Sequence, residues 1–227
     1  MQWNAIPRIN LGITSYCNAR CPFCERTIQL DSITPTHLPL EKIKSNINNL
    51  SIHTKHISIA GDFGDPLMHP EIDAVIDHIK DAGRFTIEIH TNAGLRNPKW
   101  FADLSKKYPD IEIVFGIDGL DHKTNNRYRK NVDFDLAWSN MMEYQKYADK
   151  NKCVWQFIIF PWNLGQITEA KKIAEDKNIL LYFIANDRGF NDRSKISKQM
   201  FNRIKTQYNV TAIGAYFKDN TYEKDSM

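Results

Sequence analysis

The sequence of 227 residues lacks the features that would place it in a membrane-bound or secreted class. No apolar run reaches the roughly 18 residues that a membrane-spanning helix needs. The first residues show neither a basic start followed by an apolar stretch nor a small-residue cleavage site. A net charge of only +3 gives no electrostatic argument for binding DNA or a membrane. We therefore expect a soluble, cytoplasmic protein with no membrane partner and no DNA partner.

Internal repeats, low-complexity tracts and Pro/Gly/Ser-rich linkers are also missing. The composition, 42% hydrophobic and 25% charged, is that of an ordinary globular protein. A chain of this length buries a core that folds without a metal or a disulfide, so that any metal would serve function first. We expect one domain over residues 1–213, followed by a polar C-terminal tail at 214–227.

Apolar, β-branched segments alternate with segments of helical period along the chain. The first pattern predicts strands at 8–14, 56–60, 85–90, 112–117, 154–160 and 180–184. The second predicts helices at 40–50, 70–82, 98–107, 135–150, 167–177 and 197–207. This alternation indicates an α/β fold of parallel strands with outer helices, either an open doubly wound sheet or a full or partial barrel.

Polar, glycine-bearing loops follow the first four predicted strands. They read SYCNARCPFC at 15–24, GDFGDP at 61–66, HTNAG at 90–94 and GIDG at 116–119. In both candidate folds, ligands bind at the carboxyl ends of the parallel strands. We therefore expect the four loops to form the rim of one site.

Only four cysteines are present, and three of them, Cys17, Cys21 and Cys24, lie in the first of these loops. A tight loop of this kind can aim three thiolates at an iron–sulfur cluster or a structural zinc ion. Zinc would need a distant fourth ligand, since the nearest downstream histidine is His37. A four-iron cluster held by three cysteines keeps one iron open for chemistry. Cys153, which opens the fifth strand, is predicted to be a small core residue.

The cysteine loop resembles that of the radical S-adenosylmethionine (SAM) enzymes, whose hallmark is Cys-x-x-x-Cys-x-aromatic-Cys directly after the first barrel strand. Cys17, Cys21, Phe23 and Cys24 match every defined position, and the order of the following loops extends the resemblance over residues 9–184. It implies a partial (β/α)6 TIM-like barrel. It also implies that the three cysteines ligate a [4Fe-4S] cluster whose open iron is chelated by SAM, with Phe23 against the adenine side.

The second loop resembles the Gly-Gly-Glu-Pro motif of the family, which holds the SAM amino group. It reads Gly64-Asp65-Pro66, and its carboxylate is one methylene shorter than that of Glu. A glycine permits close backbone approach, and a carboxylate accepts hydrogen bonds from an ammonium group. The alternative is a simple turn before the next helix.

The third and fourth strand ends resemble family elements that contact the ribose and carboxylate of SAM. Thr91 and Asn92 match the Thr-Asn-Gly element, although one residue separates Asn92 from the glycine. Asp118 and Gly119 match a Ser-x-Asp-Gly element, in which Gly116 replaces the usual serine. Each short motif by itself is equally consistent with a turn or a helix cap.

Two further residues follow later strands. Family members often place an arginine after the fourth strand that pairs with the SAM carboxylate, and we favour Arg129 over Arg127 for this role. The alternative is a solvated basic face. Asn163, after the fifth strand, is a candidate for contacting adenine or ribose, or else a cap of the next helix.

The resemblance implies an enzyme that cleaves SAM reductively to methionine and a 5′-deoxyadenosyl radical, which abstracts hydrogen from a substrate. Such an enzyme needs an external one-electron reductant, for example a flavodoxin or a ferredoxin. With Asn18, the cysteine loop resembles that of the peptide-modifying (SPASM/Twitch-type) branch. As the substrate we therefore favour a peptide or protein side chain over a nucleoside, tRNA or small molecule. No cysteine follows Cys153, so we expect no cysteine-rich extension with auxiliary clusters.

Two other classes stay open at the level of sequence. A barrel metallohydrolase would use strand-end carboxylates and imidazoles, although no His-x-His or His-Glu-x-x-His pair supports it. Its candidate residues are Asp62, Asp65, His69, His90 and Asp118. A non-catalytic zinc or iron–sulfur binding module would explain the cysteines but leave the later loops unexplained.

Overall fold

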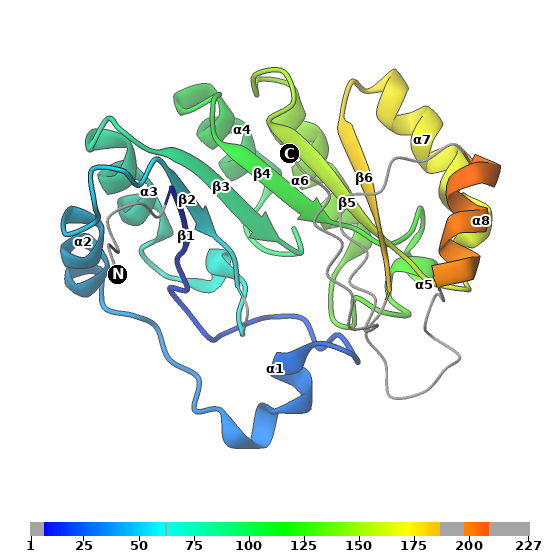
Figure 1. Cartoon of the computed structure of the whole chain (residues 1–227), viewed down its shortest axis with the longest axis horizontal. Helices are drawn as coiled ribbons and strands as arrows, with labels where there is room; N and C mark the ends of the chain where they lie inside the picture. Colours follow the sequence, from blue (N-terminus) through cyan, green and yellow to red (C-terminus); the bar gives the residue numbers. More distant parts are fainter. Residues whose placement is uncertain (1–6, 62, 187–197, 209–227) are drawn as a thin grey trace.

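The computed structural model shows six parallel strands in one curved sheet (Figure 1). It describes residues 7–61, 63–186 and 198–208. The strands are β1 (Arg8–Asn10), β2 (His56–Ile59), β3 (Thr86–Thr91), β4 (Glu112–Gly116), β5 (Cys153–Ile159) and β6 (Leu180–Ala185). Their order in the sheet is their order in the chain, as in a barrel wall, whereas the order of a doubly wound sheet reverses. The predicted α/β fold is confirmed as an open, partial barrel.

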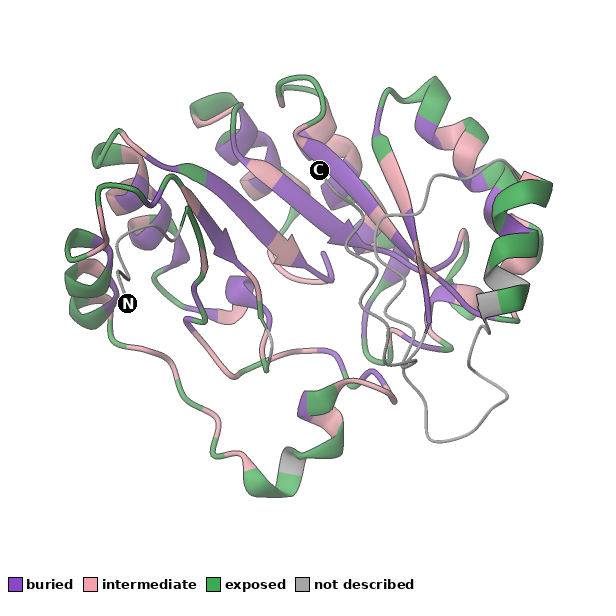
Figure 2. Cartoon of the chain, in the orientation of Figure 1, coloured by how far each residue is buried: buried purple, intermediate pink, exposed green. Residues whose placement is uncertain are grey.

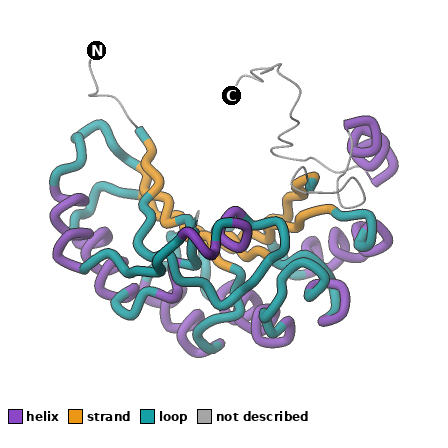
Figure 3. The backbone as a smooth tube through the Cα atoms, turned by 90° about the horizontal axis from the view of Figure 1, so that it is seen from below, coloured by secondary structure: helices purple, strands orange, loops and turns teal. Residues whose placement is uncertain are grey.

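The helices that connect the strands run along the convex side of the sheet (Figure 3). They are α2 (Leu40–Asn48), α3 (Ile72–Asp81), α4 (Pro98–Lys107), α6 (Phe134–Gln145) and α7 (Ile167–Asp176), with α8 (Lys198–Tyr208) after β6. Shorter elements are α1 (Glu25–Ile28), α5 (His122–Asn125) and the 3-10 turns η1 (Leu30–Ser32), η2 (Pro66–Met68) and η3 (Leu164–Gln166). Among the helices of the described residues, none combines the length and apolar character needed to cross a membrane.

Most predicted elements differ from the observed ones by one or two residues at an end, and two differ by more. The first strand ends at Asn10 instead of residue 14, because the chain then leaves β2 and pairs with the segment before α2, where the Leu38 amide donates to the Ile13 carbonyl at 2.9 Å. The predicted helix at 135–150 ends at Gln145, because the following residues turn and the Asp149 amide donates to the Pro109 carbonyl. The predicted helix at 70–82 begins at Ile72, after the separate turn η2.

The described residues leave two predicted limits untested. Residue 197, the start of the last predicted helix, lies outside them, and α8 begins at Lys198. The tail at 214–227 also lies outside them, so the limits of the domain at 1–213 stay a prediction.

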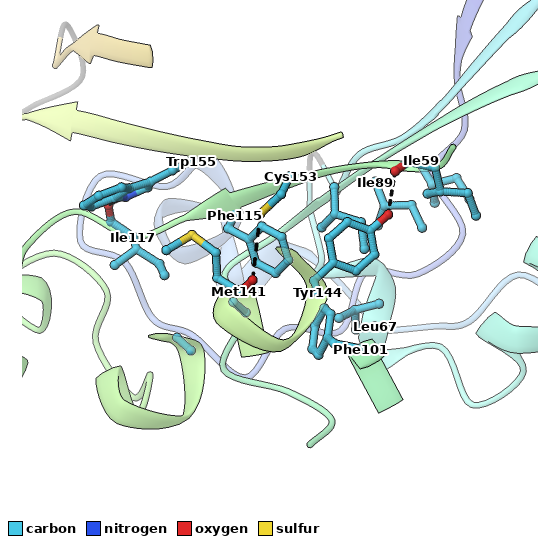
Figure 4. Close-up of a cluster of buried hydrophobic side chains, with 14 of the residues drawn as sticks. Ile59, Leu67, Ile89, Phe101, Phe115, Ile117, Met141, Tyr144, Cys153 and Trp155 are labelled. Carbon is cyan, nitrogen blue, oxygen red and sulfur yellow. Dashed lines mark hydrogen bonds between the residues drawn. The ribbon is translucent and has the colours of Figure 1, made fainter. Parts of the chain in front are cut away.

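The hydrophobic core fills the space between the sheet and the outer helices. Strand residues of one face, such as Ile89 and Phe115, pack against the helix residues Phe101 and Tyr144, while the helices expose their outer sides (Figures 2 and 4). Cys153 lies in this core with 1% of its surface exposed, and its Sγ is 3.8 Å from the Met141 carbonyl oxygen. The predicted structural role of Cys153 is confirmed.

Candidate active site at the strand ends

The cysteine loop connects β1 to α1 and is anchored at several points. The Arg20 amide donates to the Lys130 carbonyl at 3.0 Å, which attaches the loop to the segment after β4. Arg26 is buried and its Nε donates to the Ser15 carbonyl at 2.9 Å. The Cys24 amide donates to the Cys21 carbonyl, and Cys24 is the N-cap residue of α1. These contacts give the loop a defined place at the mouth of the barrel.

The three cysteines of the loop form no disulfide with one another and are partly shielded from solvent. Cys21 is buried, whereas Cys17 and Cys24 are half-buried. Burial, together with the Asp65 carboxylate, raises the pKa of Cys17 to about 12. Burial also raises the pKa of Cys21 to about 11, although Arg129 nearby opposes the shift. Both groups are therefore neutral thiols at pH 7, and binding a metal cation would release their protons.

The sulfur atoms do not form a ready-made metal cage. Within the described residues, no three side chains of His, Cys, Asp or Glu form a group that could hold a metal ion. The donor chemistry nevertheless suits an iron–sulfur cluster. Cys17 Sγ lies 3.4 Å from the Ala19 amide nitrogen and 3.7 Å from Asn92 Nδ2. Such N–H groups stabilise the negative charge of a sulfur ligand.

The second loop packs directly on the backbone of the cysteine loop. The Asp65 amide donates to the Tyr16 carbonyl at 2.8 Å. A Cβ atom on Gly64 would lie 2.3 Å from the Thr14 carbonyl oxygen and 2.7 Å from that of Tyr16, distances that no side chain tolerates. Glycine at this position therefore permits the contact between the two loops.

We expect Gly64→Ala to force the two loops apart and to lower the free energy of unfolding by about 1–3 kcal/mol, the usual cost of overpacking. Gly165→Ala is the matched control, because a Cβ on Gly165 meets nothing within 4 Å. Urea unfolding of the two variants measures the difference. If Gly64→Ala proved as stable as Gly165→Ala, the close approach of the loops would be refuted.

The Asp65 carboxylate joins the ends of β2 and β3. Its side chain accepts hydrogen bonds from the Leu67 amide, the Thr91 hydroxyl and the Asn92 amide, at 2.8–3.1 Å. Burial raises the pKa of Asp65, and these hydrogen bonds oppose the shift. Because the three partners occupy most of the lone pairs, the carboxylate first orients its own loop. A contact between Asp65 and the SAM amino group stays a prediction.

Asn92 connects the end of β3 to the cysteine loop. Its Nδ2 donates to Asn18 Oδ1 at 2.8 Å, and its Oδ1 accepts from the Gly94 amide at 2.8 Å. Asn18 Nδ2 donates in turn to the Gly94 carbonyl at 3.1 Å. Ala93 adopts a left-handed conformation, with φ of 62°, which accommodates the residue inserted before the glycine. Sequence reasoning had connected Asn18 only with a branch of the family, whereas the structure gives it this positioning role.

Asp118 and Arg129 form a buried ion pair at the end of β4. Asp118 is fully buried, and its Oδ2 lies 2.6 Å from Arg129 Nε while its Oδ1 accepts from the Ile158 amide. Burial by itself would lower the pKa of Arg129, but the Asp118 carboxylate raises it, so that the guanidinium stays charged. A Cβ on Gly116 would lie 2.6 Å from Arg129 Nη2. Glycine at position 116, in place of the serine that the family often has there, therefore leaves room for the Arg129 guanidinium.

The other candidates divide between the site and its supports. Arg127 is exposed, with its guanidinium 4.6 Å from the centre of the Trp162 ring, whereas Arg129 lies beside Asp118 and Cys21. Asn163 is fully buried; its Nδ2 donates to the carbonyls of Asp118 and Ile158, and its Oδ1 accepts from the Phe160 amide. It makes no side-chain capping bond to η3.

A row of aromatic rings extends from the cysteine loop to the end of β5. Phe23 stacks on Tyr128 at 6.2 Å between ring centres, Tyr128 contacts Phe160 at 4.8 Å, and Phe160 stacks on Trp162 at 4.4 Å. Of these rings, the sequence had indicated Phe23. Tyr128 and Phe160 carry no local signal, because their contacts depend on how the later loops fold back.

Three of the residues proposed for a metallohydrolase, His69, Asp65 and Asp118, are engaged elsewhere. His69 is buried, with its Nε2 2.9 Å from the Leu38 carbonyl oxygen and its Nδ1 accepting from the Glu71 amide. Asp65 and Asp118 hold backbone groups, and Asp62 lies outside the described residues. The described residues thus provide no ligand set for this alternative.

The chain matches one family model, described as "Radical SAM superfamily", over residues 11–171. A curated relative, the S-adenosylmethionine-dependent nucleotide dehydratase of Selenomonas ruminantium, is 31% identical over 121 residues. This alignment covers 52% of the present chain and 41% of the relative, so the chain spans under half of the relative's length.

Several solved structures share the fold. The structure "Native anSMEcpe with bound AdoMet" superposes with a TM-score of 0.64 and 16% identity, over 89% of this chain and 59% of the other. SuiB of Streptococcus suis, bound to S-adenosylmethionine, gives a TM-score of 0.68 and 17% identity, over 92% and 47% of the two chains. A radical SAM methyltransferase from Sphaerobacter thermophilus gives 0.66 and 10% identity, over 91% and 65%. At these identities the likeness concerns the fold.

Proposed function

This chain belongs to the radical SAM superfamily, and from this premise we propose that Cys17, Cys21 and Cys24 hold a [4Fe-4S] cluster at which SAM is cleaved. The enzyme class and the two cofactors, the cluster and SAM, are those of the superfamily. When bound and reduced, the cluster would supply the electron that splits SAM into methionine and a 5′-deoxyadenosyl radical. The reductant is an external one-electron donor, such as a flavodoxin or a ferredoxin.

The observation that carries the proposal is the attachment of the cysteine loop to three strand ends. Gly64 packs on the loop from β2, Asn92 hydrogen-bonds it from β3, and Lys130 accepts its backbone from the segment after β4. A loop held on three sides keeps its thiols next to the motifs at the ends of β2, β3 and β4. Preorganisation of this kind is what a site for a reactive intermediate requires.

We assign the SAM contacts residue by residue. Arg129 donates its Nε to Asp118 and also hydrogen-bonds Cys21, and we assign its guanidinium, held in this way beside the cysteine loop, to the SAM carboxylate. Phe23, already stacked on Tyr128, offers a ring face to adenine. The remaining candidates act mainly by positioning backbone groups around SAM, since their own polar atoms are hydrogen-bonded within the protein; they are Gly64, Asp65, Thr91, Asn92, Asp118 and Asn163.

For the substrate we propose a nucleotide. The support is that the curated relative at 31% identity is named a nucleotide dehydratase. The peptide side chain expected from Asn18 is the second candidate. The observed bonds from Asn18 to Asn92 and Gly94 give this residue a role in holding the loop, whatever the substrate.

The full chain, reconstituted with iron and sulfide without oxygen, reduced with dithionite and mixed with SAM, should form 5′-deoxyadenosine. We expect a slow basal rate that rises about tenfold or more with one of CTP, UTP, GTP or ATP, because substrate binding contributes to the reacting state. Liquid chromatography measures the nucleoside. A colourless protein that forms no 5′-deoxyadenosine would overturn the proposal, whereas stimulation by peptides alone would replace the nucleotide with the second candidate.

A further inference from the structure

The concave face of the sheet carries a carboxylate–imidazole pair that the SAM site does not use. Glu88 and His90 lie on β3 and alternate with Ile87 and Ile89, which belong to the core under the helices. The two polar residues therefore face the inside of the partial barrel. His90 Nε2 lies 2.5 Å from Glu88 Oε1.

Glu88 is fixed from three strands. Besides His90, its Oε1 accepts from Ser58 Oγ of β2 at 3.0 Å and from Arg8 Nη2 of β1 at 2.6 Å. Its side chain is 9% exposed. Burial by itself would raise the pKa of Glu88, but the bonds from His90 and Ser58, with the charge of Arg8, lower it to about 2. The carboxylate is thus an anion at neutral pH that binds the Nε2–H of the imidazole.

Because Nε2 of His90 is bound to Glu88, the other ring nitrogen, Nδ1, is left for the barrel interior. When the imidazole is neutral, a histidine that donates Nε2–H to a carboxylate has Nδ1 as a hydrogen-bond acceptor. Nδ1 of His90 makes no hydrogen bond to any described residue, and the side chain is 34% exposed. Because Asn92 contacts Cys17 Sγ, His90 lies two residues, or about 7 Å along the strand, below the cysteine loop.

A second polar pair, on β5 and β6, lies on the other side of the concave face from Glu88 and His90. Tyr182 of β6 donates its hydroxyl to Gln156 Oε1 of β5 at 2.8 Å. The Gln156 amide nitrogen makes no hydrogen bond to any described residue, so it is a donor for a ligand. Between the two pairs lie Val114 and Val154, which are buried and paired with each other in the sheet. The concave face therefore carries an imidazole on β3 and an amide nitrogen on β5, with two apolar side chains between them and the Glu112 carboxylate of β4 beside Glu88.

We propose that the Glu88–His90 pair binds a hydroxyl group of the ribose of a ribonucleotide and holds the sugar below the SAM site. The inference rests on the proposed function, and it deepens the assignment of the substrate. A hydroxyl donates to the imidazole acceptor and accepts from an amide such as that of Gln156. An ionised phosphate oxygen has no proton to donate to an imidazole acceptor, so the sugar and not the phosphates lies against the pair.

The test compares ribonucleotides with their deoxy analogues. The reconstituted full chain is assayed for formation of 5′-deoxyadenosine with CTP, UTP, GTP and ATP, and with the 2′-deoxy and 3′-deoxy forms of each. We expect the wild-type protein to prefer one ribonucleotide to a deoxy analogue by about tenfold or more, since losing one buried hydrogen bond costs this much. His90→Phe should bring the ratio close to one and raise KM more than it lowers kcat.

Three further variants separate recognition from general damage. His90→Gln keeps an acceptor and should restore part of the preference. Glu88→Gln removes the anion that orients the imidazole and should lower the preference even where His90→Phe fails to fold. His78→Phe is the matched control, because His78 lies on α3 outside the barrel with its Nε2 3.0 Å from Asn48 Oδ1. It should keep the wild-type ratio.

The outcomes distinguish this inference from the proposed function. If the wild-type protein forms no 5′-deoxyadenosine at all, the proposed function fails. If it cleaves SAM but no nucleotide raises the rate, or if peptides raise it instead, the ribose site is refuted while SAM cleavage stands. An unchanged ribose preference in folded His90→Phe and Glu88→Gln also overturns the inference.

Discussion

Replacing Cys17, Cys21 or Cys24 with alanine is expected to remove most of the iron from the reconstituted protein and to lower SAM cleavage by about a hundredfold or more. Even residues that only support metal ligands cost 10–100-fold on mutation, so loss of a ligand should cost at least as much, about a hundredfold. Two thiolates cannot hold the cluster with one iron open to SAM. Iron per chain, visible absorbance and 5′-deoxyadenosine are measured after anaerobic reconstitution.

Cys153→Ala is the matched control for these variants. Cys153 lies in the core beneath the sheet, far from the loop in sequence and in contact with the Met141 carbonyl. The change should lower the free energy of unfolding by about 1 kcal/mol through the small cavity it leaves, and it should preserve the iron content. Equal iron in Cys17→Ala and Cys153→Ala would contradict the assignment of the cluster to the loop.

Arg129→Met is expected to have the largest effect on stability, a loss of about 3–5 kcal/mol in the free energy of unfolding. Asp118 is fully buried, and in this variant its carboxylate loses its ion-pair partner. A buried charge without a partner is strongly unfavourable, whereas the same residue in an ion pair is tolerated. Urea unfolding of the protein without cofactors measures the effect and separates it from any loss of SAM binding.

Two comparisons make this prediction specific. Arg127→Met is the same change two residues earlier, at an exposed side chain that lies over the Trp162 ring, and should cost less than about 1 kcal/mol. Asp118→Asn combined with Arg129→Met should recover part of the stability, because no buried charge is left without a partner. A double variant no more stable than Arg129→Met would show that the ion pair is not the cause.

The strand-end motifs were found in the sequence, but the way each residue acts was not. The sequence predicted Asp65, Asp118 and Asn163 as groups that touch SAM. In the structure, hydrogen bonds to Asn92, Ile158 and Phe160 take up much of the capacity of these side chains. These partners of Asp65 and Asp118 lie 27 and 40 residues away along the chain, so that no local pattern shows which of their polar atoms are still available to a ligand.

Gly116 illustrates the same limit from the other side. From the sequence, glycine in place of the family's serine is a lost hydroxyl contact. The structure shows that the space belongs to the guanidinium of Arg129, which arrives from the segment after α5. The sequence correctly identified Gly116 as a departure from the family pattern. The reason for the departure is Arg129, which lies 13 positions later in the chain (129 − 116).

The sequence by itself determined the alternation of strands and helices, the spacing of Cys17, Cys21 and Cys24, and the order of the polar loops, because these depend on periodicity and on neighbours along the chain. Only the tertiary structure decided that Glu88 would be held by Arg8 and Ser58 on the concave face. That outcome follows from the register of β1, β2 and β3, in which Ser58 pairs with Glu88. Register is set by packing of the whole sheet, and it brings together residues up to 80 positions apart.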